Sequence, residues 1–177
     1  MSEGPGGGKD SRQHEDLLSG STGGSSHGGA GSDSYDLYQR GLDLLGRGSA
    51  AAAAQLLERA AAAEPGSLSV LEALARAQFD ARRYTEAAGS FRQIVEECPS
   101  DDYAQFGLGL ALARSGDPRA AAEHLALAAA MRPDLRHYTD ALRGVRATIR
   151  AQDQARGESQ PSQGHASEGQ ARGQGQQ

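Results

Sequence analysis

The chain has no tryptophan and a single cysteine, Cys98, among its 177 residues. One cysteine excludes an intramolecular disulfide framework and fits a reducing compartment. The N-terminal sequence, MSEGPGGGKDSRQHED, lacks the apolar core of a signal peptide. Long apolar runs are also missing, because the longest, from Leu108 to Ala113, is far shorter than the ~20 residues of a membrane span. We therefore expect a cytoplasmic protein that does not bind a membrane.

Lysine is nearly absent, since 17 arginines and only Lys9 supply the positive charge within a net charge of −5. Residues 34–151 hold 15 acidic side chains and 14 arginines, so this part is close to neutral. Such a balance gives no strong basic footprint, and we do not expect nucleic acid as a partner. Arg143, Arg146 and Arg150 recur at helical spacing, but Asp140 interrupts them, and we interpret them as a solvated helix face.

Large apolar side chains are scarce at both ends of the chain. Residues 1–33 are dominated by Gly and Ser, with Leu17 and Leu18 as the only large aliphatic residues after the initiator Met. Residues 152–177 are mainly Gln, Gly and Ser and contain no large apolar side chain. Neither stretch can bury enough surface to offset the entropy of ordering it. We predict two disordered tails, 1–33 and 152–177, around a folded domain at 34–151.

Signatures of catalysis are also missing. No GxxxxGK[ST] loop is present, and the glycines before Lys9 lack the strand–loop–helix setting of a phosphate site. The histidines do not form an HxxxH pair or stand near a second cysteine, as zinc sites require: they are His14, His27, His124, His137 and His165. We interpret Cys98 as a half-buried packing residue. We therefore predict a protein that is not an enzyme and has no metal site and no cofactor.

The sequence does contain a repeat. Pro65, Pro99 and Pro133 are separated by 34 residues each time. When three units are counted from residues 34, 68 and 102, small and large apolar residues agree in register. The eighth places hold Gly41, Ala75 and Gly109; the twentieth hold Ala53, Ala87 and Ala121; the twenty-fourth hold Leu57, Phe91 and Leu125.

This pattern resembles the tetratricopeptide repeat, a 34-residue helix–turn–helix unit with small residues at its eighth and twentieth places and proline at its thirty-second. The resemblance implies an all-α fold, an α-solenoid of three repeats with a C-terminal capping helix. The predicted ranges are units 34–67, 68–101 and 102–135 and a capping helix at 136–151. The fourth residue of each unit departs from the Trp often found in the family: Leu37, Leu71 and Gln105 stand there.

Local signals refine this prediction. Asp117 is placed to cap a helix that begins at Pro118, and Ser49 is placed to cap another. The turn before Tyr84 lacks a glycine, and we expect packing of Tyr84 to hold it. Glycine at the eighth place is expected to admit the second helix near the alanine at the twentieth place. In the capping helix, one apolar face is expected to lie on the last unit: Leu135, Tyr138, Leu142, Val145 and Ile149.

The resemblance also implies a binding surface, because ligands of this family usually lie in a concave groove lined by the first helix of each unit. The groove residues that it implies here are Tyr35, Tyr38, Leu42, Glu72, Arg76, Phe79, Tyr103, Phe106 and Leu110. Five of the eight aromatic residues of the chain fall at groove places. In the alternative interpretation, these aromatics pack between neighbouring first helices, or the capping helix covers Phe106 and Leu110.

The lining differs from that of chaperone-binding members, which hold terminal carboxylates with Lys, Asn and Arg. The corresponding places hold Tyr38, Leu42, Ala73, Phe106 and Leu110. An apolar or aromatic protein segment is therefore the expected partner, and a non-catalytic adaptor or scaffold is the expected function. The alternative is a structural protein that self-assembles into homo-oligomers through its uncapped first repeat, where Leu37, Leu44 and Leu56 would be buried by a second copy. A further hypothesis is that the tail docks Leu17 and Leu18 into the groove.

Overall fold

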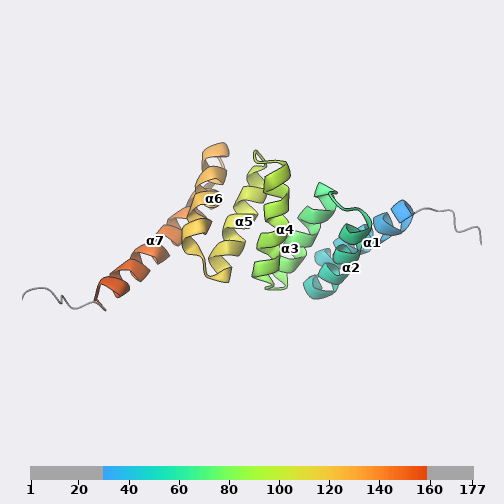
Figure 1. Cartoon of the computed structure of the whole chain (residues 1–177), viewed down its shortest axis with the longest axis horizontal. Helices are drawn as coiled ribbons and strands as arrows, with labels where there is room; N and C mark the ends of the chain where they lie inside the picture. Colours follow the sequence, from blue (N-terminus) through green and yellow to red (C-terminus); the bar gives the residue numbers. More distant parts are fainter. Residues whose placement is uncertain (1–29, 159–177) are drawn as a thin grey trace, which may run out of the picture.

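A computed structural model of the chain describes residues 30–158, which form seven α-helices and no strand (Figure 1). Most of both predicted tails lies outside these residues. The helices are α1 (Ala30–Gly46), α2 (Ala50–Ala63), α3 (Leu68–Asp80), α4 (Tyr84–Glu97), α5 (Asp102–Ser115), α6 (Pro118–Met131) and α7 (Arg136–Glu158).

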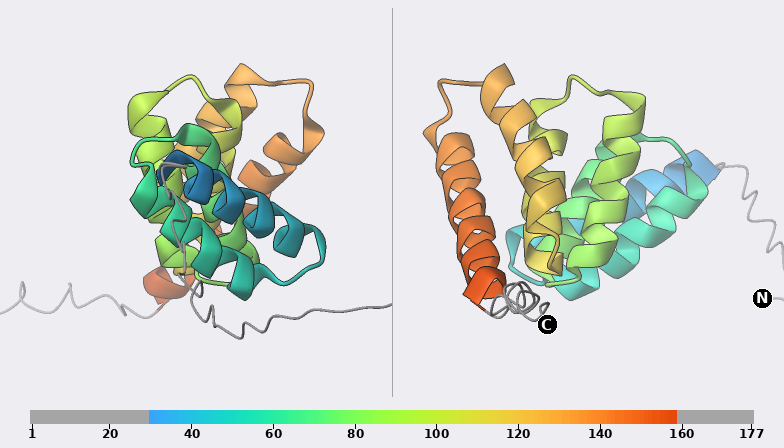
Figure 2. Two further views of the ribbon diagram at one scale, coloured as in Figure 1. Left: turned by 90° about the vertical axis from the view of Figure 1, so that its right-hand side faces the viewer. Right: turned by 60° about the vertical axis from the view of Figure 1, so that its left-hand side comes forward.

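The helices form a row, in which each one packs against the next along the chain (Figure 1). The first helices of successive units also touch, so that α1 contacts α3, α3 contacts α5, and α5 contacts α7. Figure 2 shows α1 and α2 at one end of the row and α7 against α6 at the other. The predicted solenoid of three helix–turn–helix repeats with a C-terminal capping helix is therefore confirmed.

Glycine residues, which have no side chain, allow the two helices of a unit to pack closely. A Cβ added at Gly41 would lie 2.6 Å from Cγ of Leu57, and one at Gly109 would lie 2.6 Å from Cγ of Leu125. The second helix of the unit thus comes close at both glycines, as expected, and at Gly41 the nearest side chain is Leu57. The leucine one turn later fills that space, because helical side chains lean toward the N-terminus of their own helix. The alanines, such as Ala53, are nevertheless fully buried, as close helix packing requires.

The two helices of the middle unit pack without a glycine at the eighth place. Its eighth residue is Ala75, which leaves less room than a glycine, and its twenty-fourth is Phe91. The Phe91 ring instead lies on α5 of the next unit, where a Cβ added at Gly107 would be 2.4 Å from Cζ of that ring. Phe91 is therefore held between two units and is only 2% exposed.

Helix starts follow the predicted caps only in part. The Asp117 carboxylate accepts a hydrogen bond from the Ala120 N–H at 3.1 Å, and Pro118 occupies the first turn of α6, as predicted. The Ser49 side chain makes no capping bond, so that prediction was wrong. Asp101, which we did not predict as a cap, accepts from the Ala104 N–H at 2.9 Å.

The turn between α3 and α4 is held without a glycine. Arg82 adopts the left-handed conformation with φ 63°, which is uncommon for a residue with a side chain. The edge of the Tyr84 ring packs on Phe79 with centroids 5.3 Å apart, so the expected role of Tyr84 packing is confirmed as a contact. Arg83 adds ion pairs to Glu58 of α2, at 2.7 Å, and to Glu86 of its own helix.

The ends of the folded part differ from the predicted boundaries. Helix α1 begins at Ala30, four residues before the predicted start, and α7 ends at Glu158, seven residues after the predicted end. The added turns of α7 contain Ala, Gln and Arg, which are good helix formers, and Asp153 pairs with Arg119 of α6. The lack of large apolar residues after residue 151 led us to predict a tail there. A helix that extends along the surface can nevertheless form with few apolar residues.

The capping helix covers the last unit as expected. Tyr138 and Val145 are buried, and Leu142 and Ile149 pack partly buried against the central core. The outward face carries exposed arginines, namely Arg136, Arg143, Arg146 and Arg150. The apolar stripe of α7 thus closes the C-terminal end of the solenoid.

Candidate functional site

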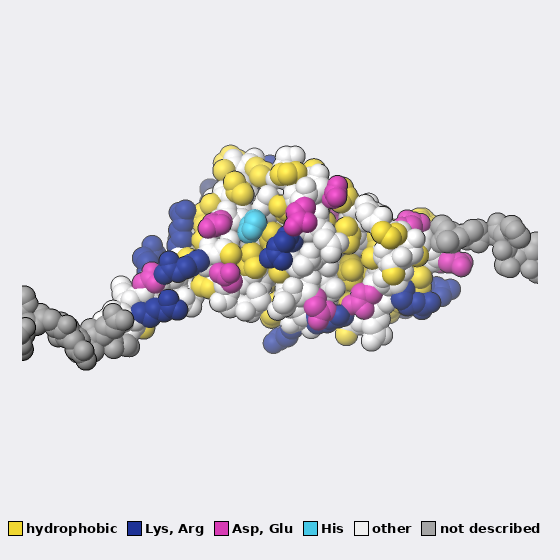
Figure 3. Space-filling view, in the orientation of Figure 1, with side chains coloured by type: hydrophobic (Ala, Val, Ile, Leu, Met, Phe, Trp, Pro, Cys, Tyr) yellow, Lys and Arg dark blue, Asp and Glu magenta, His cyan; other side chains and the backbone are white. Residues whose placement is uncertain are grey.

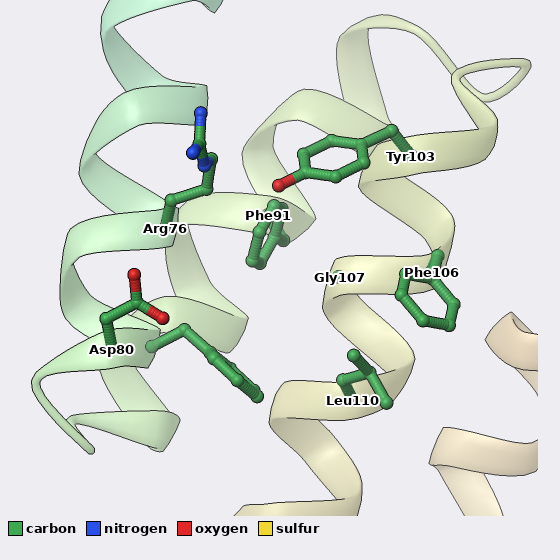
Figure 4. A pocket seen from close by; sticks show the side chains of 8 residues that line it. Arg76, Asp80, Phe91, Tyr103, Phe106, Gly107 and Leu110 are labelled. Atoms are coloured by element: carbon green, nitrogen blue, oxygen red, sulfur yellow. The ribbon is translucent and has the colours of Figure 1, made fainter. Parts of the chain in front are cut away.

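A pocket of about 250 Å³ opens between α3 and α5, with α4 behind it (Figure 4). Its walls are mostly aromatic or aliphatic, and one cation and one carboxylate lie at its edge. The lining residues are Arg76, Phe79, Asp80, Phe91, Tyr103, Phe106, Gly107 and Leu110.

Helical spacing brings these side chains together. Arg76, Phe79 and Asp80 are three and four residues apart on α3 and so share one face. Tyr103, Phe106 and Leu110 follow the same spacing on α5 and form the opposite wall. The floor is Phe91 of α4, whose ring comes between the two walls because Gly107 has no side chain (Figure 4).

The aromatic rings of the pocket also serve the core. The rings of Phe91 and Tyr103 form a T-shaped contact with centroids 6.2 Å apart. Phe106 stacks on Tyr138 of α7 with centroids 4.3 Å apart and planes inclined by 19°. The His137 ring also contacts the Phe106 ring, with centroids 5.3 Å apart and nearly perpendicular planes. The capping helix therefore covers one side of Phe106, as the alternative interpretation expected, while the ring still lines the pocket.

Two charged groups lie at the pocket without a partner of their own. Neither Arg76 nor Asp80 forms an ion pair within 4 Å in the described part of the chain, where the paired arginines are Arg83, Arg119, Arg132 and Arg143. Both side chains are exposed. Burial raises the pKa of the Tyr103 hydroxyl, so this group is neutral and can donate a hydrogen bond at neutral pH.

The structure gathers five of the nine predicted groove residues in this pocket: Arg76, Phe79, Tyr103, Phe106 and Leu110. The remaining four lie elsewhere. Tyr38 and Leu42 are partly buried against the core of the first unit, and Tyr35 is 60% exposed on α1. Glu72 is exposed on α3 and does not line the pocket.

Sequence reasoning missed the floor of the pocket. Phe91 was predicted only as the large apolar residue of a twenty-fourth place, and neither Phe91 nor Gly107 was placed in the groove. The available signal was their coincidence, since Phe91 is the one aromatic at a twenty-fourth place and Gly107 the one glycine at a sixth place, where Gln39 and Ala73 stand in the other units.

Other polar side chains have structural partners. His124 Nδ1 lies 2.8 Å from the Gln105 Oε1, and burial lowers the pKa of this histidine. Gln105 in turn donates to the Pro99 carbonyl at 3.0 Å. Between residues 30 and 158, no three His, Cys, Asp or Glu side chains are grouped to hold a metal ion. None of the seven helices combines the length and the apolar character that a membrane span needs.

Charged side chains are distributed unevenly over the surface of the molecule. Figure 3 shows hydrophobic side chains over the middle of one face, interspersed with acidic and basic groups. Arginine side chains gather toward the end that α7 forms, at the left of the view. The pocket between α3 and α5 is thus separate from the most basic part of the molecule.

Comparisons with known proteins agree with the architecture. A sequence model described as tetratricopeptide repeat matches residues 38–102 and 73–135. No curated protein matches the chain. Among solved structures, the first TPR of Spaghetti (RPAP3) bound to an HSP90 peptide is 17% identical, with a TM-score of 0.62 over 67% of this chain and 94% of that one.

Two further structures support the same fold. The first TPR domain of human RPAP3 is 17% identical and has a TM-score of 0.63 over 71% of this chain and 98% of that one. A MamA structure from MSR-1 is 22% identical and has a TM-score of 0.63 over 70% of this chain and 71% of that one. The family match spans more than half of the sequence, and the chain belongs to the tetratricopeptide repeat family.

Proposed function

We propose that the protein is a non-catalytic adaptor that holds a segment of a partner protein in the groove along α1, α3 and α5. The observation that carries this proposal is the open pocket between α3 and α5, whose walls are Phe79, Tyr103, Phe106 and Leu110. Aromatic side chains that face a cavity offer large contact area at low entropic cost, which is typical of protein-binding surfaces. Tyr103 remains 39% exposed and is available for contact.

The size of the pocket favours a protein segment over a small molecule. Its volume of about 250 Å³ is below the roughly 300–1,000 Å³ of pockets that enclose drug-sized ligands. A side chain of a partner can fill it while the partner backbone stays in the open groove. The first TPR of Spaghetti (RPAP3), which has a similar fold, is likewise bound to a peptide, from HSP90.

The chemistry of the groove favours an apolar partner. The five places where other family members hold carboxylates carry Tyr38, Leu42, Ala73, Phe106 and Leu110. None of these side chains carries a positive charge that could form an ion pair with a terminal carboxylate. The single cysteine of the chain fits a reducing compartment, so we place this function in the cytoplasm.

Self-assembly is the second candidate. Leu37, Leu44 and Leu56 of the first unit are only partly buried, and in the part of the chain that the structure describes no helix covers the outer side of that unit. A second copy could bury them. Sedimentation over a hundredfold range of concentration would show a rising mass if this candidate is correct.

The adaptor proposal is tested by affinity capture from extracts of the cells that make this protein. The baits are wild type, Arg76→Glu/Leu110→Glu in the pocket, and Arg59→Glu, an exposed position on α2, as the matched control. All three should have the same helicity by circular dichroism. A prey retained by wild type and the control but lost from the pocket variant is expected. A prey that all three retain equally would contradict a role for this groove.

A further inference from the structure

The depth of the pocket comes from one residue pair. Gly107 removes a side chain from the middle of the α5 wall, and Phe91 closes the space behind it with a ring that is 2% exposed. The floor is therefore rigid, because Phe91 is packed from both sides. A rigid apolar hole of this kind suits a single large side chain better than several small ones.

The walls of the hole favour an aromatic ring. Phe79, Tyr103 and Phe106 line the pocket together with Phe91, and the Tyr103 ring extends from α5 over Phe91 toward Arg76 (Figure 4). Aromatic pairs prefer edge-to-face or offset contacts with centroids about 4.5–7 Å apart, and Phe91 and Tyr103 of the pocket already meet in this way. An inserted aromatic ring could make such contacts with several of these rings at once, whereas an aliphatic side chain would gain only from burial.

The edge of the hole carries charges of both signs in a fixed order. Arg76 lies on the side of Tyr103, and Asp80 lies one helical turn further on, on the side of Leu110 (Figure 4). Neither has an ion-pair partner among residues 30–158. A ligand that neutralises both must present an acidic group at the Tyr103 end and a basic group at the Leu110 end, because charge-assisted hydrogen bonds need opposite signs.

We propose that this pocket takes one aromatic side chain of a partner segment, with an acidic residue on the Arg76 side of the ring and a basic residue on the Asp80 side. The proposal rests on the adaptor function and specifies the partner that the groove selects. The aromatic ring supplies affinity by burial against Phe91, and the flanking charges set the direction in which the segment lies.

The test is selection from a library of displayed random twelve-residue peptides on four immobilised full-length proteins. These are wild type, Arg76→Glu, Asp80→Arg and the control Arg59→Glu. Wild type and the control should enrich peptides with one aromatic residue between an acidic and a basic one. Arg76→Glu should replace the acidic flank by a basic one, and Asp80→Arg should replace the basic flank by an acidic one.

The contribution of the aromatic residue to affinity is then measured with a synthetic peptide from the wild-type selection. Replacing its aromatic residue by alanine should weaken binding by at least about 30-fold, as expected for a central interface residue. Peptides that depend on the pocket but lack the aromatic residue, or whose flanking charges do not change with Arg76→Glu, would overturn this inference and leave the adaptor function standing. Leu110→Glu is measured beside these proteins with the selected peptides. If no selected peptide binds Arg76→Glu, Asp80→Arg or Leu110→Glu more weakly than wild type, both proposals fail.

Discussion

At the scale of single residues, the same amino acid has opposite roles at different places in this protein. Gly107 is essential for packing, since a Cβ there would meet the buried Phe91 ring at 2.4 Å. Gly144 lies in the exposed middle of α7, where an added Cβ would find nothing within 4 Å. Both glycines cost helix stability, and only the contacts around them decide the outcome of substitution.

We therefore predict opposite effects for two identical substitutions. Gly107→Ala should destabilise the fold, because overpacking costs about 1–3 kcal/mol and the gain in helix propensity offsets only about 1 kcal/mol of it. Gly144→Ala should stabilise it by about 0.5–1 kcal/mol, since it gains propensity without a clash. Urea unfolding of both variants measures the difference. Equal effects would contradict the packing of Phe91 on α5.

Tyr138 couples the capping helix to the last unit through a titratable group. Its hydroxyl donates to Asp102 Oδ2 at 2.9 Å, and burial, followed by this hydrogen bond, raises its pKa to about 12. The folded-state pKa thus exceeds the unfolded value of about 10. The stabilisation is complete below pH 10 and is lost as pH rises from about 10 toward 12, because the unfolded chain releases the proton first.

Tyr138→Phe should lower the free energy of unfolding at pH 8 by about 1 kcal/mol, the usual net value of a lost hydrogen bond. It should also make that free energy less dependent on pH between 9 and 11.5 than in wild type. The chain suits this measurement because its one lysine, Lys9, contributes little to alkaline titration. Parallel pH curves for the two proteins would show that the hydroxyl does not titrate as described.

At the scale of helices, the turns decide where each element starts. Asp101 and Asp117 accept hydrogen bonds from backbone N–H groups, at 2.9 and 3.1 Å, whereas the Ser49 and Ser67 side chains make no such bond. Asp101→Ala and Asp117→Ala should each cost about 1 kcal/mol. Ser49→Ala and Ser67→Ala should change stability by less than about 0.5 kcal/mol. Thermal unfolding of the four variants tests this, and a large loss at Ser49 would contradict it.

Close approach of the paired helices sets a second expectation. Ala87 is fully buried at the twentieth place of the middle unit. Ala87→Leu should destabilise the domain by about 1–3 kcal/mol, because the added carbons force α3 and α4 apart. Ala147→Leu, at an exposed place on α7, is the control and should be nearly neutral. Equal melting temperatures for the two variants would argue against tight packing at Ala87.

Much of the fold and part of the site could be predicted from the sequence. The period of Pro65, Pro99 and Pro133 determined the helix order because each repeat unit carries its own turn signals. The aspartate cap before Pro118 was predicted correctly, whereas the serine at Ser49 makes no capping bond although its place in the unit is equivalent. The pocket floor was missed because Phe91 and Gly107 lie in different units, and only the packing of α4 on α5 brings them together.

At the scale of the whole molecule, each unit is stabilised by contacts with its neighbours, and the terminal units depend on capping helices. A chain ending at Leu135 would lose α7, uncover Phe106 and leave Asp102 without Tyr138. We expect it to unfold at a clearly lower temperature and to bind hydrophobic dyes. A chain ending at Ala151 should melt within a few degrees of the full chain, because the lost pair of Arg119 and Asp153 is exposed and contributes little. Similar melting of both truncations would contradict the capping role of α7.

The arrangement of surfaces assigns different roles to the two ends and the middle. The arginine-rich face of α7 is exposed, none of the seven described helices covers the outer side of the first unit, and the pocket lies between them at the junction of α3 and α5. A partner segment along the first helices would therefore cross the pocket at its centre. Binding energy should concentrate there, where the walls are aromatic and the floor is rigid.

The absence of tryptophan allows the most direct test of this account. Tyr103→Trp places the only indole of the chain at the pocket, and Leu127→Trp places it at a 48% exposed position on α6, outside the groove. Titration with the captured partner, or with a selected peptide made without tryptophan, should shift the emission of the first variant to shorter wavelength and leave the second unchanged. A shift only at Leu127→Trp, or none at Tyr103→Trp while binding is retained, would contradict a binding site between α3 and α5.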